Sequence, residues 1–126
     1  MIEFRVEVHP LPEQAEIKLI AINVANEDIA AEFSTSQFFD FIIIGPEGEE
    51  VYHYAEGRFF LQAFQSIKIR KGSRKSWKCR WDYRKNGRRV KGGMYDIHAR
   101  LLPYSINGRR IEQHISGRAR FAVPEE

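Results

Sequence analysis

The sequence predicts an all-β fold, a single antiparallel β-sandwich of about eight or nine short strands that spans residues 1–126. Apolar and polar residues alternate with a period of two through most of the chain. Turn signals rich in Gly, Pro and Asn separate these runs, and no stretch has the period of an amphipathic helix. A length of 126 residues favours one domain with its own core.

The first half of the chain supplies five predicted strands. Ile2 to Val8 alternates apolar and charged residues and ends at Pro10, because proline cannot donate a hydrogen bond to a strand ladder. The later strands end at polar or Gly-Pro turns, of which Gly45–Gly48 is the tightest. The five strands are predicted at residues 2–8, 16–24, 29–33, 38–44 and 49–54.

The second half begins with an irregular segment, Ala55 to Ala63, which contains Gly57 and has no period of two. We expect a loop there, with one helical turn at most. Asn86-Gly87 and Asn107-Gly108 are strong signals for tight turns. No internal repeat, linker or low-complexity segment is apparent. Four further strands are predicted at residues 64–69, 74–82, 94–102 and 115–123.

Composition excludes several classes of protein. Hydrophobic residues make up 43% of the chain and charged residues 29%, which fits neither a disordered nor a membrane protein. The start of the chain carries a charge at every second residue, unlike a secretory signal, and the single Cys79 cannot form an internal disulfide. We therefore expect a cytoplasmic protein with no membrane partner. Its oligomeric state stays open.

Charge is unevenly distributed along the sequence. Residues 1–67 carry a net charge of −9, residues 68–91 carry +11 and residues 92–126 carry +1. The basic segment Lys68–Lys91 could bind an anionic partner, either an acidic protein or a nucleic acid. Alternation places Trp77 and Trp81 on the face opposite Lys78, however, so the tryptophans are expected in the core and the cations on the outer face of neighbouring strands. Acidic residues are expected opposite these cations.

The sequence contains no recognisable catalytic or cofactor motif. Neither a nucleophile elbow nor a phosphate-binding loop occurs, so we expect no enzyme activity and no cofactor. The four histidines lack metal-ligand spacing and are expected to be surface or half-buried strand residues, although a site assembled in three dimensions stays open. Cys79 shares a face with two tryptophans and is expected to be a small core residue.

Several segments in the middle of the chain resemble one family when they are taken in order. Phe33 to Phe41 reads FSTSQFFDF, similar to the pattern Phe-Ser-Ser-Gly-Gln-x-Tyr-Asp-Phe of the BsuPI intracellular proteinase inhibitors. The family's Phe-x-Gln-Ala segment is matched at Phe60 to Ala63, and its Pro-Gly-x-Tyr segment at Gly92 to Tyr95. The prolines of two family turns are replaced by Lys71 and Gly92. The resemblance covers about residues 17–102.

The resemblance implies an immunoglobulin-like β-sandwich that inhibits an intracellular, subtilisin-type serine protease. An inhibitor of this kind must present a rigid exposed loop to the protease cleft. Three loops are candidates, Ala55–Ala63, Tyr83–Val90 and Pro103–Ile111, although each could be an ordinary connection. The candidate contact residues are Glu56, Arg58, Phe59, Arg84, Lys85, Asn86, Arg88, Arg89, Tyr104, Asn107 and Arg109. The alternative is a non-inhibitory module that binds an anionic partner through residues 68–91.

Overall fold

The computed structural model describes residues 1–126 and contains strands and turns only. The all-β prediction is confirmed, but the strand count is higher than eight or nine. There are thirteen strands in four sheets, because four strands have only two residues each and escape a search for alternating patterns. No helix has the length and apolar character needed to span a membrane.

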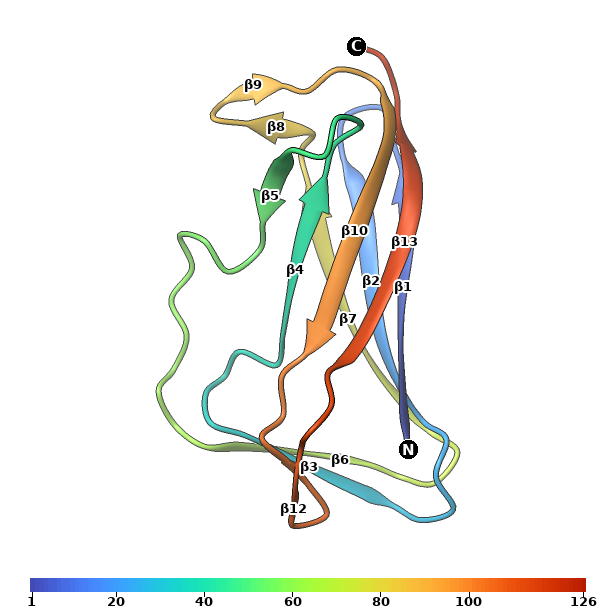
Figure 1. Ribbon diagram of the computed structural model, residues 1–126, viewed down its shortest axis with the longest axis vertical. Helices are drawn as coiled ribbons and strands as arrows, with labels where there is room; N and C mark the ends of the chain where they lie inside the picture. The colour runs from blue at the N-terminus through green and yellow to red at the C-terminus, as the bar shows by residue number, and fades with distance from the viewer.

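Two sheets form the body of the molecule. One has the strand order β1-β2-β7, with β1 (Ile2–Pro10), β2 (Ala15–Asn23) and β7 (Arg74–Trp81). The other has the order β13-β10-β4-β5, and its strands lie in front of the first sheet in Figure 1. A cluster of 23 buried residues fills the space between the layers. The second sheet consists of β4 (Phe39–Ile44), β5 (Glu50–His53), β10 (Gly93–Leu101) and β13 (Ile115–Val123).

Smaller sheets lie at the two ends of the body. At the end near the N-terminus, a sheet of order β12-β11-β3-β6 runs across the molecule (Figure 1). At the opposite end, near the C-terminus, β8 and β9 form a separate hairpin. The strands of these two sheets are β3 (Ile29–Phe33), β6 (Gln65–Ile69), β8 (Arg84–Lys85), β9 (Arg88–Arg89), β11 (Ser105–Ile106) and β12 (Arg109–Arg110).

The long strands follow the sequence pattern closely. β3 and β13 begin and end at the predicted residues, and the other predicted strands agree to within two residues at each end. Trp81 is fully buried and Trp77 is half-buried against the core, as the alternation in β7 predicts. The segment after β5 forms hydrogen-bonded turns and an extended stretch, without the helical turn allowed for Ala55–Ala63.

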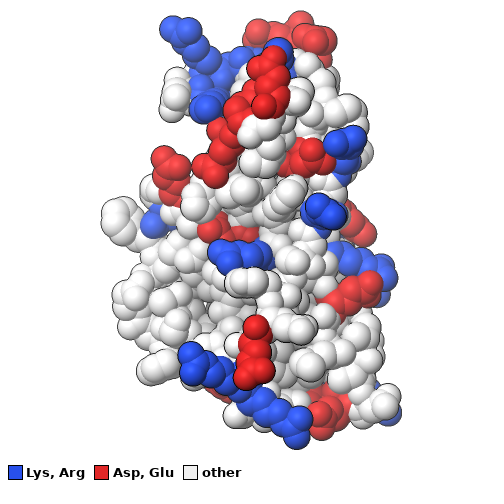
Figure 2. Space-filling model, viewed as in Figure 1, with Lys and Arg blue, Asp and Glu red and all other residues white.

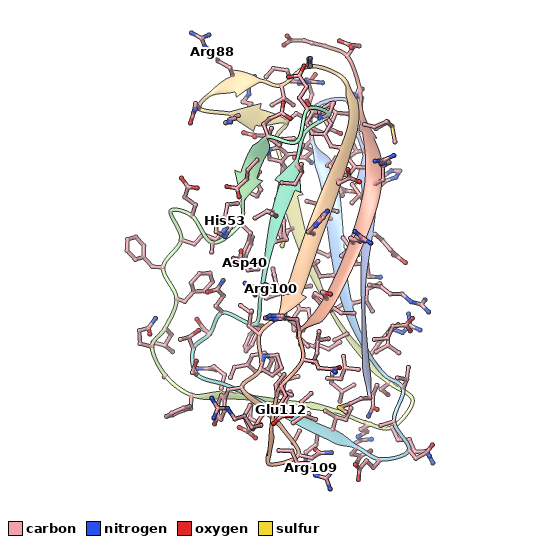
Figure 3. All side chains as sticks on the ribbon, in the orientation of Figure 1. Asp40, His53, Arg88, Arg100, Arg109 and Glu112 are labelled. Atoms are coloured by element: carbon pink, nitrogen blue, oxygen red, sulfur yellow. The ribbon has the colours of Figure 1, made fainter.

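The structure reveals a short internal repeat that contradicts the expectation of none. Tyr83 to Val90 (YRKNGRRV) and Tyr104 to Ile111 (YSINGRRI) form the same hairpin. In both, Asn and Gly have positive φ, and the last residue donates its N–H to the carbonyl of the first, at 2.8 and 3.1 Å. The two copies lie at opposite ends of the molecule, near the labelled Arg88 and Arg109 in Figure 3.

Candidate functional site

Three of the four most exposed large apolar side chains lie on one long connection. Residues 54–64 run from β5 to β6 along the side of the molecule (Figure 1), and we call them the exposed loop. Phe59 is 99% exposed, Phe64 77% and Leu61 64%. Large apolar side chains in such a position are not needed for the core, so the loop is the first place to look for a contact surface.

Asp40 fixes the beginning of the exposed loop. One carboxylate oxygen accepts the backbone N–H groups of Phe41 and Ala55 at 2.9 and 3.1 Å. The other lies 2.6 Å from Nε2 of His53, and Figure 3 shows the two side chains side by side. Asp40 therefore ties the turn that follows β5 to the neighbouring strand β4.

Tyr54, the first residue of the exposed loop, contacts residues in the middle of the loop. Its ring packs against Phe39 and Phe41 of the core, with centroids 4.8 and 5.1 Å apart. The Arg58 guanidinium lies 4.1 Å from the centroid of the same ring, and Arg58 Nε donates to the Tyr54 carbonyl at 2.8 Å. The Phe60 ring also approaches Tyr54, at 6.3 Å. A half-buried tyrosine that packs against the core thus contacts both sequence neighbours of Phe59.

Ser36 fixes the far part of the loop. Its hydroxyl accepts the backbone N–H of Leu61 at 2.8 Å, and its own N–H donates to the Leu61 carbonyl at 3.0 Å. These two bonds clamp one residue of the loop against the β3–β4 connection. The loop is therefore irregular in conformation but held at both ends, an arrangement that reduces the entropy lost when a loop binds.

His53 and two glutamates form a polar cluster beside the start of the loop. The pKa of His53 is raised, first by the hydrogen bond to Asp40 and further by the charges of Asp40, Glu50 and Glu56, whereas burial lowers it. Potential ligand atoms of Glu50, His53 and Glu56 lie within 4.8 Å of one another, so these residues could hold a metal ion. The two glutamates are exposed, and each lies three residues from His53, one on β5 and the other in the turn that follows it.

The hairpin β8–β9 places its candidate residues in different environments. Arg84, Lys85 and Asn86 are exposed, as is Arg88, which points away from the body in Figure 3. Arg89 has a side chain only 7% exposed. Its guanidinium donates to the carbonyls of Pro12 and Pro124 at 3.1 and 3.0 Å and lies 4.9 Å from the Tyr83 ring centroid. Arg89 thus joins the hairpin to the β1–β2 connection at Pro12 and to the C-terminal segment at Pro124. Its guanidinium is therefore not available to bind a partner.

The candidate residues of Pro103–Ile111 also lie in different environments. Tyr104 is half-exposed and packs edge-on against Phe64 at the end of the exposed loop, at 5.9 Å. Asn107 is held inside the molecule's own network, since its Oδ1 accepts the Ala30 N–H at 2.8 Å and its Nδ2 donates to the Asp28 carbonyl at 3.2 Å. Arg109 is exposed at the molecule's end (Figure 3). The contact between Tyr104 and Phe64 therefore brings the third candidate loop beside the end of the exposed loop, one residue beyond Ala55–Ala63.

The basic segment does not form one face, which corrects the expectation of neighbouring strands. β6 pairs with β3, β7 pairs with β2, and β8 and β9 form a sheet of their own. Acidic residues lie among the cations as expected: Arg80 faces Glu16 across the β2–β7 ladder, and Lys91 approaches Glu47 at 3.4 Å. Figure 2 shows positive and negative groups interspersed over the face in view. The concentrated positive field expected of a nucleic-acid surface is missing from that face.

The residues that hold the exposed loop were not among the sequence candidates. These residues are Ser36, Asp40 and Tyr54. Ser36 and Asp40 are far from Phe59 in sequence, and a tyrosine such as Tyr54 beside a strand carries no functional signal in sequence. One signal was present, because Ser36 and Asp40 both lie in the segment Phe33 to Phe41 that carries the resemblance. The structure therefore connects that segment with the conformation of one particular loop.

Comparison with known families agrees with the sequence resemblance. A family model described as BsuPI, intracellular proteinase inhibitor, matches residues 2–104. The match includes β1, which lies before the region of about 17–102 recognised from the motifs, and it contains the whole exposed loop. No curated protein matches the chain significantly in sequence.

Several solved structures resemble the fold at low sequence identity. A β-glucosidase from Kluyveromyces marxianus in complex with glucose has a TM-score of 0.51 at 8% identity, over 99% of this chain and 14% of that one. A protein from Archaeoglobus fulgidus covers 98% of both chains at 16% identity, with a TM-score of 0.41. The chain thus spans about one seventh of the first similar structure. At these identities the likeness concerns the fold alone.

Proposed function

Since the chain belongs to the BsuPI family of intracellular proteinase inhibitors, we propose that it inhibits an intracellular serine protease of the subtilisin type by docking the exposed loop. Membership in the family implies a protease as the partner. The serine type, the immunoglobulin-like character of the sandwich and a cytoplasmic location are parts of the same proposal. The protein acts here as a binding partner and not as an enzyme.

The observation that carries the choice of loop is the combination of exposure and support. Phe59 is 99% exposed, yet Arg58 and Phe60 on either side of it pack on Tyr54. The other two candidate loops are short hairpins, and each commits one side chain, Arg89 or Asn107, to internal hydrogen bonds. An exposed segment held by a rigid sheet is what an inhibitor without disulfides needs.

Support for the loop also comes from the family segment itself. Asp40 and Ser36 hydrogen-bond to the backbone of Ala55 and Leu61, at the two ends of the exposed loop. The part of the chain with the most specific resemblance thus maintains the loop conformation. A protease–inhibitor interface buries about 800 Å² on each partner, and the neighbouring Phe64 and Tyr104 extend the apolar surface beside the loop.

Two measurements test this proposal. The first is the rate of peptide hydrolysis by a purified intracellular subtilisin-type protease, which we expect to fall as the protein is added. Unchanged hydrolysis at about 10 μM protein, against several such proteases, would contradict the proposed activity. The second is amide hydrogen exchange in the complex. We expect new protection in residues 54–64, whereas protection confined to residues 84–89 or 105–110 would move the contact to one of the hairpins.

A further inference from the structure

The local geometry singles out one residue of the exposed loop. Arg58 and Phe60 turn back onto the ring of Tyr54, at 4.1 and 6.3 Å. Phe59 lies between them and is 99% exposed, so its ring makes almost no contact with the rest of the protein. An isolated phenyl group in water gains free energy when it enters an apolar pocket, and nothing within this chain provides that pocket.

The backbone around Phe59 is equally available. Neither its N–H nor its C=O forms a hydrogen bond within the chain. The nearest backbone anchors are Arg58, whose N–H donates to the Ala55 carbonyl at 3.1 Å, and Leu61, which is held by Ser36. An extended peptide with free backbone groups can pair with a strand of a partner, while its exposed side chain fills a pocket.

We propose that Phe59 is the specificity-determining residue of the inhibitor and enters the primary specificity pocket of the protease. This inference rests on the proposed function and names its partner class. The target is then a protease whose pocket accepts a large apolar or aromatic side chain, since pocket chemistry decides which side chain a serine protease accepts. A protease with an acidic pocket, which requires Lys or Arg at this position, is excluded.

The anchors around Phe59 explain why such a loop would inhibit rather than serve as a substrate. Hydrolysis of the Phe59–Phe60 peptide bond consumes one water and leaves a carboxylate on Phe59 and an amine on Phe60. The new ends separate slowly, because Tyr54 holds Arg58 and Phe60, and Ser36 holds Leu61. Both ends remain positioned for resynthesis of the bond, so the complex persists.

The first test compares two phenylalanines of the same loop. Phe59→Ala should weaken inhibition of a protease with a large apolar pocket by at least about 30-fold, the size expected when a hot-spot residue is truncated. Phe64→Ala removes another exposed ring, at the edge of the same surface and beyond the Ser36 clamp, and should weaken inhibition by a smaller factor than Phe59→Ala does. Because the Phe59 ring packs against nothing, Phe59→Ala should unfold at the same temperature as the parent protein.

A second test changes the specificity instead of removing it. Phe59→Lys should lose inhibition of the protease with the apolar pocket and gain inhibition of a trypsin-type protease, whose pocket is acidic. Mass spectrometry after long incubation of the parent protein with its protease should find the first cleavage between Phe59 and Phe60. Cleavage first at another bond would contradict the assignment.

The outcomes separate the two levels of the proposal. If the parent protein inhibits and Phe59→Ala inhibits equally well, Phe59 is not the specificity residue, although the proposed function stands. If Phe64→Ala produces the larger loss, the contact lies nearer Tyr104 and the assignment is overturned. If the parent protein inhibits no protease of either pocket class, the proposed function itself fails.

Discussion

Tyr54 connects the exposed loop to the core. Its ring packs on Phe39 and Phe41 of the core and also contacts Arg58 and Phe60 of the loop. Burial raises the pKa of the Tyr54 hydroxyl, with a further contribution from Cys79, so the group stays neutral where the protein is folded. A neutral, stacked ring suits the cation above it, since the aromatic face attracts a guanidinium.

Ser36 offers a residue-scale test of how the loop is held. Ser36→Ala removes the acceptor for the Leu61 N–H, an exposed hydrogen bond whose loss should cost about 1 kcal/mol or less. Amide exchange in residues 58–64 should become faster, and inhibition should weaken because a mobile loop loses more entropy on binding. Ser34→Ala, at an exposed serine of the same segment, is the control. Equal exchange rates in the two variants would contradict the role of Ser36.

His53 should make the free energy of unfolding depend on pH. Its pKa is raised in the folded protein, mainly by the hydrogen bond to Asp40, so folding favours the protonated ring. The contribution is complete below about pH 6.5, the ordinary value of histidine, and is lost as the pH rises through the raised pKa. Urea unfolding should show this loss above pH 6.5, and His53→Gln should abolish it. The exposed His98→Gln control should retain it; an unchanged profile in His53→Gln would refute the assignment.

At the scale of elements, the sequence defined the long strands better than their partners. The alternation in β7 predicted the buried face of Trp77 and Trp81 because a strand's period of two is local information. Pairing depends on contacts between distant residues, and β6 and β7 therefore fell into different sheets although they follow each other in sequence. The Asn-Gly signals predict both tight turns, whereas the surrounding repeat becomes evident when the two hairpins are compared in the structure.

The repeated hairpins provide a matched comparison at the element scale. Asn86 and Asn107 occupy the same turn position with φ of 53° and 51°, so replacing either by Ala incurs the same backbone strain. Only Asn107 also bonds the Ala30 N–H and the Asp28 carbonyl. Asn107→Ala should therefore be about 1 kcal/mol more destabilising than Asn86→Ala in chemical denaturation. Equal losses would show that these side-chain bonds contribute nothing net.

The exposed loop marks where sequence reasoning reached its limit. Phe59 could be named a candidate because the surrounding segment lacks any strand pattern. Its isolation could not be predicted, since it arises when Tyr54 attracts both Arg58 and Phe60. Asp40 bonds across the β4–β5 pair, and Ser36 bonds from the β3–β4 connection to Leu61; both contacts join residues distant in sequence and are set by tertiary packing. The site was thus predicted as a segment, while its anchors required the structure.

At the scale of the whole molecule, the two main sheets meet along a seam between β1 and β13. Gly117 on β13 lies so close to β1 that an added Cβ would stand 2.3 Å from the Phe4 carbonyl oxygen. Glycine is needed there for close approach and not for backbone freedom, since its φ is not in the left-handed region. The seam bears on the proposed inhibition because it fixes one edge of the front sheet, and the exposed loop follows β5 at the opposite edge.

Gly117→Ala should consequently destabilise the entire sandwich. The methyl group would meet backbone on β1, which cannot rotate away as a flexible side chain could, so the two sheets must separate slightly. Forced overpacking of this kind costs about 1–3 kcal/mol, and thermal unfolding should shift downward accordingly. Ser116→Ala, at the preceding exposed residue of β13, should leave the unfolding temperature nearly unchanged.

If Gly117→Ala unfolds at the same temperature as the parent protein, β1 can move away from β13 without loss of stability, and the seam does not hold the sheets together. If it melts earlier but inhibits normally below its transition, the seam sets stability alone, and the conformation of the exposed loop depends on its local anchors.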